Sequence, residues 1–486
     1  MVPRAELPVA AAAAASMGGL LLAEQYNSSI EDAFIANYIN PTVRLGQINR
    51  YYAKHREPRP RKSWARLNRF MTDRQFRRYF RMSKDMYQKL CHDIEDIIGA
   101  EEFKSEDFLN NMLTTPRVGS ANNIYTAHEN STGGMISGEI QLAITLRILG
   151  GGSYMDIAMF YESSFNHAHK IFKHVVNDWL CHPSFYPING IEYCSDDDRM
   201  REVALQFATA SNNVINGCIG ALDGWVVKVQ RPAERDGVPD PTSFYSRKGF
   251  YAINVQAIVD KRKCVLFRSI MSRGAEHDST AFKKSSLYKW LSVNWRLMVE
   301  KGYFFIGDSA YSLKSFLLTP YDNALHDTPE DNYNFFHSSS RISVECCFGE
   351  IDLRFGIFWR PLKFSLDMNC NIIDACMRMH NFIVNNREEG IGMDPVDKDV
   401  FDDDARRFFA VHPDEDEGVY GGEEDARLDE NGHVQRGGRP QRYEVSSTET
   451  GKMWRDRHRN EIAILGLERP RSNWFRERNR LLVEEY

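Results

Sequence analysis

Two acidic residues stand in apolar surroundings where a charge needs a partner. Asp223 lies within GCIGALDGWVVKVQ (217–230), an apolar run bounded by glycine that predicts a buried strand. Asp308 follows a second apolar run, in YFFIGDSAY (303–311). An ionised carboxylate in an apolar interior is costly unless it is hydrogen-bonded, paired or bound to a metal. Each acid is therefore either held by a local hydrogen bond near a strand end or part of a functional site.

A third acid, Glu345, favours the functional interpretation. It lies in RISVECCFGEIDLRF (341–355), where Val344, Phe348 and Ile351 recur at the spacing of one helical face. Glu345 stands beside that face and can point toward the strands. Three converging acids repel one another unless a cation joins them, and Mg²⁺ is held by a few carboxylates plus phosphate oxygens. The three acids together predict a divalent cation.

Charge is distributed unevenly along the 486 residues, although the formal net charge is only -6. Residues 388–430 contain seventeen acids and four bases, whereas residues 44–84 contain fourteen bases and two acids. This division indicates a basic arm that faces nucleic acid and an acidic segment that is solvating or regulatory. With 42% hydrophobic residues over its full length, the chain can bury a large core.

The nine cysteines form no CxxC pair, which is typical of reduced thiols in an intracellular protein. Cys370, Cys376 and His380 could be metal ligands, but their spacing matches no zinc motif, so core packing is the favoured interpretation. There is no apolar run of membrane-spanning length. The alanine-rich start, 9–23, is interpreted as a tail and not as a signal peptide.

Two helical regions precede the acids. Helical spacing of Phe76, Phe80, Tyr87 and Leu90 predicts amphipathic helices in the basic arm. Three further helices are predicted over 139–149, 154–160 and 164–180, and a triple glycine separates the first from the second. This arrangement is compatible with a helix-turn-helix-like region. In the third of these helices, Lys170 and Lys173 are candidates for contact with DNA phosphates, and the alternative is a small all-helical subdomain without a role in DNA binding.

The elements around the acids follow a recognisable order. Runs 251–259 and 264–271, joined by a tight polar turn, predict an antiparallel hairpin. Residues 274–291 predict a helix with Asp278 or Ser279 as its N-cap. The Asp308 strand, an irregular segment at 321–340 and the Glu345 helix follow. Three strands, a helix, a strand and a closing helix match the element order of a ribonuclease H-like fold.

The chain resembles the PIF/Harbinger-type DDE transposases and their domesticated relatives. The resemblance spans roughly residues 140–386 and rests on six motifs: ALDGW (221–225), FYSRKGFYAINVQ (244–256), GAEHDS (274–279), GDSAY (307–311), RISVECCFGEIDLRF (341–355) and MHNF (379–382). It implies an α/β architecture, in which a ribonuclease H-like catalytic domain with a mixed sheet and helices follows a helical, helix-turn-helix-like region. It also implies that Asp223, Asp308 and Glu345 are the metal-binding DDE triad.

The same resemblance implies a function. Members of this family cut double-stranded DNA at transposon ends and join it to a target in the nucleus. By the same resemblance, a Myb-like protein is expected to assist DNA binding, and a homo-oligomer is expected to form on DNA. The expected mechanism uses two Mg²⁺ or Mn²⁺ ions held by the triad. Two alternatives remain open: a catalytically silent DNA- or chromatin-binding protein on the same scaffold, and a nuclease acting on RNA–DNA hybrids.

Further candidate residues surround the triad. His277, Asp278 and Arg341 could position the reacting groups, although a helix cap for Asp278 and a structural ion pair for Arg341 are the alternatives. Arg247 and Lys248 are further candidates for contact with DNA.

Three positions depart from the family pattern. Trp225 stands where a small or hydroxyl residue often follows Asp-Gly, and Ala310 stands where the motif has glycine. Asp352 stands where a lysine is usual. These departures put activity in question but not the fold. The expected organisation of the chain is a disordered N-terminal tail (1–43), a basic helical arm (44–98), a loop (99–136), the helix-turn-helix-like region (137–182), the nuclease domain (213–386), an acidic disordered segment (387–451) and a basic C-terminal tail (452–486).

Overall fold

The computed structural model describes residues 71–100, 103, 136–161, 165–233, 236–387 and 442–469, together with Trp64 and Arg69. The predictions for the N-terminal tail, for most of the basic arm and the following loop, and for the acidic residues 388–430 therefore lie outside the described residues.

The chain divides into two units. The described part of the first unit contains α10 (Tyr154–Phe160) and the start of α11 (Phe165–His174). The second unit contains the end of α11, the remaining elements and all three acids of the predicted triad. Because α10 and α11 occupy two of the helical segments that the sequence predicts, the helical content of this region is confirmed.

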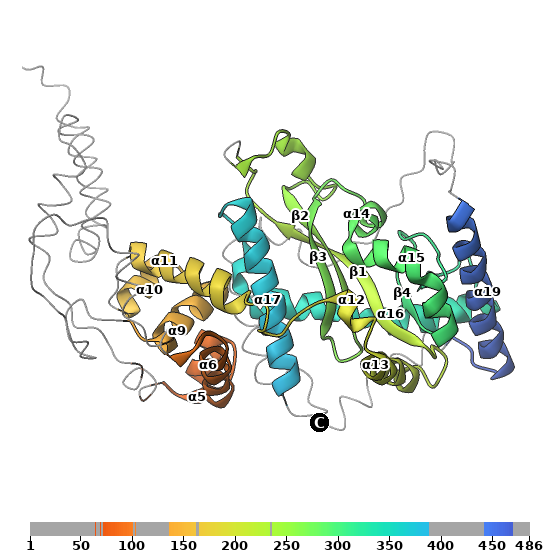
Figure 1. Cartoon of the computed structure of the whole chain (residues 1–486), viewed down its shortest axis with the longest axis horizontal. Helices are drawn as coiled ribbons and strands as arrows, with labels where there is room; N and C mark the ends of the chain where they lie inside the picture. Colours follow the sequence, from red (N-terminus) through yellow and green to blue (C-terminus); the bar gives the residue numbers. More distant parts are fainter. Residues whose placement is uncertain are drawn as a thin grey trace, which may run out of the picture. The chain divides into compact units, whose positions relative to one another are not determined.

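The second unit is built on a five-stranded sheet with the strand order β3-β2-β1-β4-β5 (Figure 1). Its strands are β1 (Cys218–Lys228), β2 (Ala252–Val259), β3 (Val265–Arg273), β4 (Phe304–Ile306) and β5 (Leu317–Leu318). Antiparallel pairing joins β1 to β2 and β2 to β3, whereas β4 is parallel to β1 and β5 is parallel to β4. The β2–β3 hairpin is as predicted, and this mixed sheet confirms the ribonuclease H-like α/β fold.

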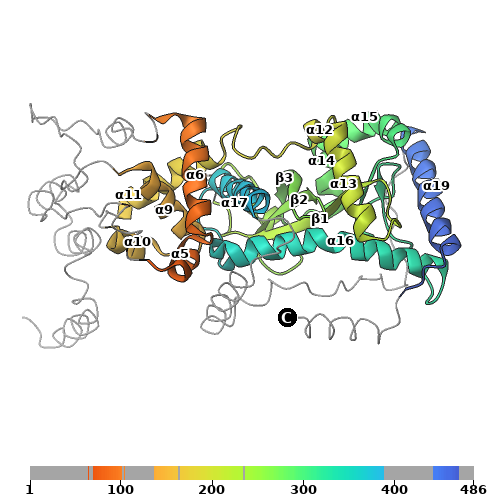
Figure 2. The ribbon, with the colours of Figure 1, turned by 90° about the horizontal axis from the view of Figure 1, so that it is seen from below.

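Helices cover both faces of the sheet, as the alternation of side chains along β1 requires. Trp225 stacks on Phe348 of α16 (Pro329–Arg354), whereas the neighbouring Gly224 faces Asp278, the first residue of α14 (Asp278–Lys284). Figure 2 accordingly shows α16 below the strands and α14 above them. Helix α15 (Ser286–Lys301) follows α14, and α13 (Asp197–Ala210), which lies in a segment the sequence left unassigned, also packs against β1.

The helices before the sheet bury the residues that the sequence singled out. Phe76 and Phe80 lie on α5 (Asp73–Phe80), and Tyr87 and Leu90 lie on α6 (Lys84–Ile98). All four are at most 1% exposed. Both helices pack against α9 (Gly138–Leu149), which confirms the predicted amphipathic helices over 73–98. The remaining short elements are η2, a π-helix (Val175–Leu180) that continues α11, α12 (Gly190–Tyr193), η4 (Pro241–Phe244) and η5 (Gly356–Trp359).

Helix α16 begins earlier than predicted, so the expectation of an irregular segment up to residue 340 was wrong. Thr328 is the N-cap and accepts a hydrogen bond from the Asp331 N–H, while Pro329 occupies the first helical position. Proline is tolerated at this position because a backbone N–H there would have no acceptor within the helix. The sequence TPED is therefore a helix start and not a loop signal.

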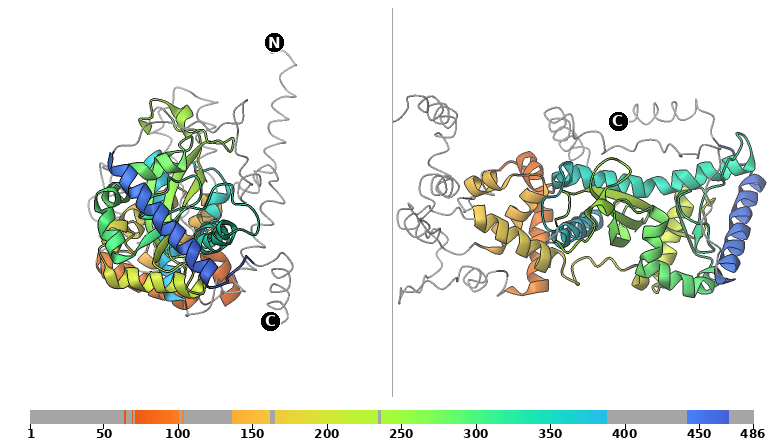
Figure 3. Two further views of the ribbon diagram at one scale, coloured as in Figure 1. Left: turned by 90° about the vertical axis from the view of Figure 1, so that its right-hand side faces the viewer. Right: turned by 90° about the horizontal axis from the view of Figure 1, so that it is seen from above.

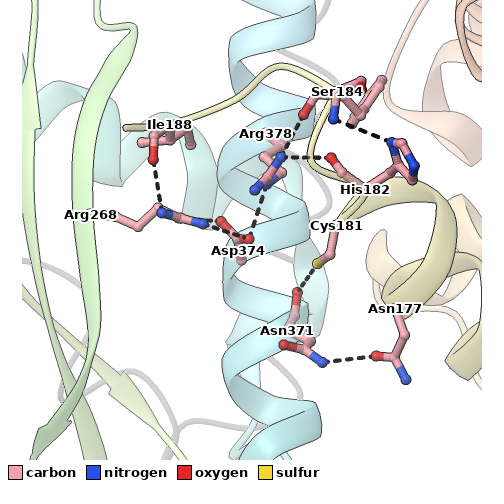
Figure 4. A network of polar contacts seen from close by, with 10 residues as sticks. Asn177, Cys181, His182, Ser184, Ile188, Arg268, Asn371, Asp374 and Arg378 are labelled. Carbon is pink, nitrogen blue, oxygen red and sulfur yellow. Dashed lines mark hydrogen bonds and ion pairs between the residues drawn. The ribbon is translucent and has the colours of Figure 1, made fainter. Parts of the chain in front are cut away.

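A buried ion-pair network fixes α17 (Leu366–Asn386) to β3 and to the segment after η2 (Figure 4). Arg268 forms a two-pronged pair with Asp374, and the Arg378 side chain also contacts that carboxylate, at 3.0 Å. Arg378 donates to the carbonyls of His182 and Phe185, at 3.0 and 2.7 Å. Since arginine and carboxylate match geometrically in such pairs, the network orients α17 as well as neutralising Asp374.

The last described helix, α19 (Arg442–Ile464), corrects the expectation of a disordered segment up to 451 and a tail from 452. It contacts β5 and α16 and covers that edge of the sheet (Figure 3). Ile462 is fully buried, and the Trp454 ring packs edge-on against Phe304 of β4. The basic residues conceal a buried face, made of Ser447, Gly451, His458 and Ile462, that the charge pattern did not reveal. None of the described helices is long and apolar enough to cross a membrane.

Candidate active site

Asp223 lies on the central strand and is held from two sides. Its Oδ1 accepts a hydrogen bond from the Gly224 N–H at 2.8 Å, and its Oδ2 accepts one from Arg341 Nη1 at 2.7 Å. The Asp223 side chain is 18% exposed, although the five strand residues before it are fully buried. Both predicted explanations for this acid are therefore visible: a local hydrogen bond and convergence with charged groups.

Asp308 is brought beside Asp223 by parallel strand pairing. Ala221 pairs with Ile306, so continuing two residues along both strands leads to Asp223 and Asp308. Neighbouring strands are about 4.8 Å apart, so this pairing brings Asp308, in the turn after β4, near Asp223. The Asp308 carboxylate accepts a hydrogen bond from the Ala310 N–H at 3.0 Å, which fixes the turn after β4.

Glu345 reaches the same place from α16. Its carboxylate pairs with Arg341 Nη2, and its side chain is 49% exposed. Arg341 and Glu345 are four residues apart and hence one turn apart on the helix. Arg341 therefore bridges an acid of the sheet and an acid of the helix.

The pKa of Asp223 reflects both its burial and the charges of the groups around it. Burial raises the pKa of Asp223 to about 7, and the positive charge of Arg341 opposes this rise. The charges of Asp308 and Glu345 raise the pKa of Asp223 further. The charges of the other two acids of the predicted triad thus both act on Asp223.

The three carboxylates are chemically suited to a divalent metal ion, but they are not grouped around a common point in this structure. Three carboxylates supply the hard oxygen ligands that Mg²⁺ and Mn²⁺ prefer, so the residues fit such an ion chemically. Within the described part of the chain, however, no three acidic, histidine or cysteine side chains are grouped as a ready ligand set. The guanidinium of Arg341 contacts two of the three acids, Asp223 and Glu345.

Of the other predicted candidates, His277 and Asp278 lie at the start of α14 and not beside Arg341. His277 is the N-cap, in place of the predicted Asp278 or Ser279, and its Nδ1 accepts from the Ser279 N–H at 3.4 Å. Asp278 approaches β1 at Gly224, whose side-chain direction is opposite to that of Asp223. A β-carbon at residue 224 would lie 2.4 Å from the Asp278 carboxylate, so a larger residue there would displace the Asp278 side chain.

A polar network that sequence reasoning missed supports this second face. Asn254 and Gln256 donate to the Asp278 carboxylate at 2.8 and 3.0 Å, and the Tyr311 hydroxyl donates to Gln256 at 2.6 Å. Tyr311 belongs to the same turn as Asp308, so the network ties that turn to β2 and α14. Two amides at alternate positions of an otherwise apolar strand were the available signal.

The four predicted DNA-contacting residues are exposed, as contact with phosphate requires. Lys170 and Lys173 lie on α11, and Arg247 and Lys248 lie in the connection between β1 and β2. Their role in binding DNA stays a prediction.

Two of the three departures from the family pattern contact each other. The Trp225 side chain donates a hydrogen bond to Asp352, whose pKa is raised by burial to about 7. The Trp225 hydrogen bond, Lys248 and Lys228 oppose this rise. The third departure, Ala310, is not among the described residues with a left-handed backbone, so it needs no glycine.

The comparisons with known proteins agree with this fold and site. Residues 222–381 match the DDE superfamily endonuclease family. The chain is 23% identical over 279 residues to an ALP1-like protein of Arabidopsis thaliana, which covers 55% of this chain and 65% of that protein. It is 29% identical over 173 residues to the Bos taurus protein HARBI1, whose name describes a candidate nuclease, covering 34% of this chain and 46% of that protein.

The Homo sapiens HARBI1 protein is 28% identical over 171 residues, which cover 34% of this chain and 45% of that protein. The chain thus spans about half the length of the HARBI1 relatives it matches. No solved structure matches it. The family match and these relatives indicate a nuclease- or transposase-like protein. Over residues 222–381, the chain is similar to the DDE superfamily endonucleases, as its motifs predicted.

Proposed function

We propose that this protein is a metal-dependent DNA endonuclease that cleaves phosphodiester bonds with Asp223, Asp308 and Glu345. The observation that supports this proposal most strongly is the convergence of three acids from β1, the turn after β4 and α16. A family match over the same residues accompanies it. Cleavage at transposon ends, joining to a target and action in the nucleus extend the same proposal.

In this proposal the three acids act together. Asp223, Asp308 and Glu345 would hold two Mg²⁺ or Mn²⁺ ions through their carboxylate oxygens. The chemistry that such ions supply is activation of water or a 3′-hydroxyl and neutralisation of charge on the leaving oxygen. The sheet fixes the first two acids, while the polar network through Tyr311 steadies the Asp308 turn. No protein nucleophile is needed.

In this proposal the protein binds its DNA substrate mainly through the DNA phosphates. Exposed Lys170, Lys173, Arg247 and Lys248 are the candidate contacts, and such contacts give affinity without reading sequence. Sequence recognition would then come from elsewhere, for which a Myb-like partner and a homo-oligomer on DNA are the proposed sources.

One observation favours the second candidate, a silent DNA- or chromatin-binding protein. Arg341 partly neutralises Asp223 and Glu345 within the chain, so the acids can be tolerated in the fold without a metal. In a silent binder these contacts would be a permanent structural ion pair.

A plasmid-nicking assay tests the proposal, because a single cut converts a supercoiled circle into a relaxed one. We expect nicking in Mg²⁺ or Mn²⁺ that stops with a chelator and falls by about 10³-fold or more in Asp223→Asn, as for other essential catalytic groups. DNA binding should remain or tighten slightly, because a negative charge near phosphate is removed. Asp352→Asn is the matched control, since it removes another buried acid outside the triad. Binding without any metal-dependent nicking would instead identify the silent binder.

A further inference from the structure

The side chain of Arg341 occupies the space between two acids of the proposed metal site. Nη1 contacts Asp223 Oδ2 at 2.7 Å, and Nη2 contacts a carboxylate oxygen of Glu345. The Arg341 side chain is only 18% exposed, so this is not a pair of freely solvated surface groups. One guanidinium therefore joins β1 to α16 at the proposed site.

Arg341 also opposes the mutual repulsion of the acids. The charges of Asp308 and Glu345 both act on Asp223, and Asp223, Glu345 and Asp308 all act on Arg341. A guanidinium holds two carboxylates through a rigid fork of donors, which a rotating ammonium group cannot reproduce. Arg341 thus partly fulfils the charge-neutralising role expected of a divalent cation.

An incoming cation would compete with this arrangement. Both carboxylate oxygens of Asp223 already accept hydrogen bonds, one from the Gly224 N–H and one from Arg341. The backbone N–H is fixed by the strand, whereas the arginine side chain can rotate away. Among the described residues, no three possible ligands are grouped closely enough to hold a metal ion.

We propose that Arg341 is a positioning residue that acts as an internal counter-ion, holding Asp223 and Glu345 together until a divalent cation displaces its guanidinium. The proposal rests on the proposed function and concerns the regulation of the same site. It has two consequences. The metal-free site is kept compact, and the affinity for metal is reduced by the cost of breaking the two arginine contacts.

Calorimetric titration of the full-length protein with Mn²⁺, without DNA, tests this directly. Arg341→Gln should bind Mn²⁺ about tenfold more tightly than the wild type, equivalent to about 1.4 kcal/mol. Arg341→Lys should lie between them, because lysine keeps the charge but not the two-pronged contact. A residue that merely supported the ligands would change the affinity in the opposite direction.

Arg268→Gln provides the matched control. The Arg268 side chain is 23% exposed and also pairs with a carboxylate, that of Asp374, outside the site (Figure 4). Its loss should lower the melting temperature without changing the affinity for Mn²⁺. Arg341→Gln should also melt lower than the wild type without metal, because the acids then repel, but Mn²⁺ should raise its melting temperature more than that of the wild type.

The outcomes separate this inference from the function on which it rests. Tighter Mn²⁺ binding in Arg341→Gln that disappears when Asp223→Asn is added supports both. Equal or weaker binding in Arg341→Gln and Arg341→Lys, with clear binding by the wild type, overturns the counter-ion role and leaves the metal site intact. Absence of Mn²⁺ binding at the triad in all of these proteins overturns both.

Discussion

At the scale of single residues, the two departures Trp225 and Asp352 explain each other. By its sequence, Asp352 puts a negative charge at a position where the family pattern usually has a lysine. In the structure this carboxylate accepts a hydrogen bond from Trp225, whose ring is held by Phe348 and Phe358. The pair is a local solution to a buried acid, which needs a donor when it is removed from water.

The energetic link between these two residues can be measured by a double-mutant cycle. Trp225→Phe keeps an aromatic ring but removes the donor, so it should lower the free energy of unfolding by about 1–3 kcal/mol. In the background of Asp352→Ala the same substitution should cost less, with a coupling energy of about 1 kcal/mol. Urea denaturation of the four proteins gives the coupling. Strictly additive effects would show that the two side chains do not depend on each other.

At the scale of elements, the acids converge because three different elements have fixed relative positions. Parallel pairing of β1 and β4 places Asp223 beside Asp308, and packing of α16 on β1 brings Glu345 to them. The edge strand β5 then needs cover, which α19 provides. At Gly451, a β-carbon would lie 2.6 Å from the Lys314 carbonyl group, so a glycine allows the helix to approach the sheet.

Two glycine substitutions within helices test how closely α19 is packed. Gly451→Ala should lower the free energy of unfolding by about 1–3 kcal/mol, because the added methyl group meets backbone atoms that cannot move easily. Gly349→Ala is the matched control in α16, where an added β-carbon meets nothing within 4 Å. It should raise stability by about 0.5–1 kcal/mol through helix propensity. Equal effects of both substitutions in urea denaturation would contradict the docking of α19.

Much of this arrangement could be predicted from the sequence, and the remainder has physical reasons. Alternating apolar runs and turn residues located the β2–β3 hairpin, and helical spacing located α5 and α6. The convergence of the acids was expected from the family motifs. What the sequence did not reveal were pairings between distant residues, such as Trp225 with Asp352. It also missed α19, whose buried positions are diluted by charged residues.

At the scale of the whole molecule, stability depends on histidines that are buried without charge. Burial lowers the pKa of His337 and of His380 from 6.5 to about 4. His380 Nε2 lies 2.8 Å from the Lys263 carbonyl, and His337 Nε2 lies 3.1 Å from the Leu318 carbonyl. The unfolded chain therefore takes up protons first as the pH falls. The two histidines, buried in their neutral form, therefore contribute fully to the free energy of unfolding above about pH 6.5. This contribution is lost as the pH falls toward 4.

The contribution of His380 is isolated by comparing the wild type with His380→Gln across this range. Other groups also change the unfolding free energy over this pH range, and the raised pKa of Asp352 changes it in the opposite direction. Their contributions are the same in both proteins and therefore cancel when the variant is subtracted from the wild type. Between pH 8 and pH 5 the wild type should lose about 2 kcal/mol of unfolding free energy relative to the variant. Urea denaturation at several pH values gives this difference. A constant difference would mean that His380 has the same pKa in the folded and unfolded chain.

In the proposed function, Asp223, Asp308 and Glu345 together bind a divalent cation. Anomalous diffraction from crystals of the protein grown with Mn²⁺ can locate this ion, with Asp223→Asn crystals as the control. We predict an anomalous peak within about 2.5 Å of carboxylate oxygens from Asp223 and at least one of the other two acids, with the Arg341 guanidinium turned away. The peak should be absent from the Asp223→Asn crystals. Wild-type crystals with no manganese at the triad, and with Arg341 still bridging Asp223 and Glu345, would contradict the account.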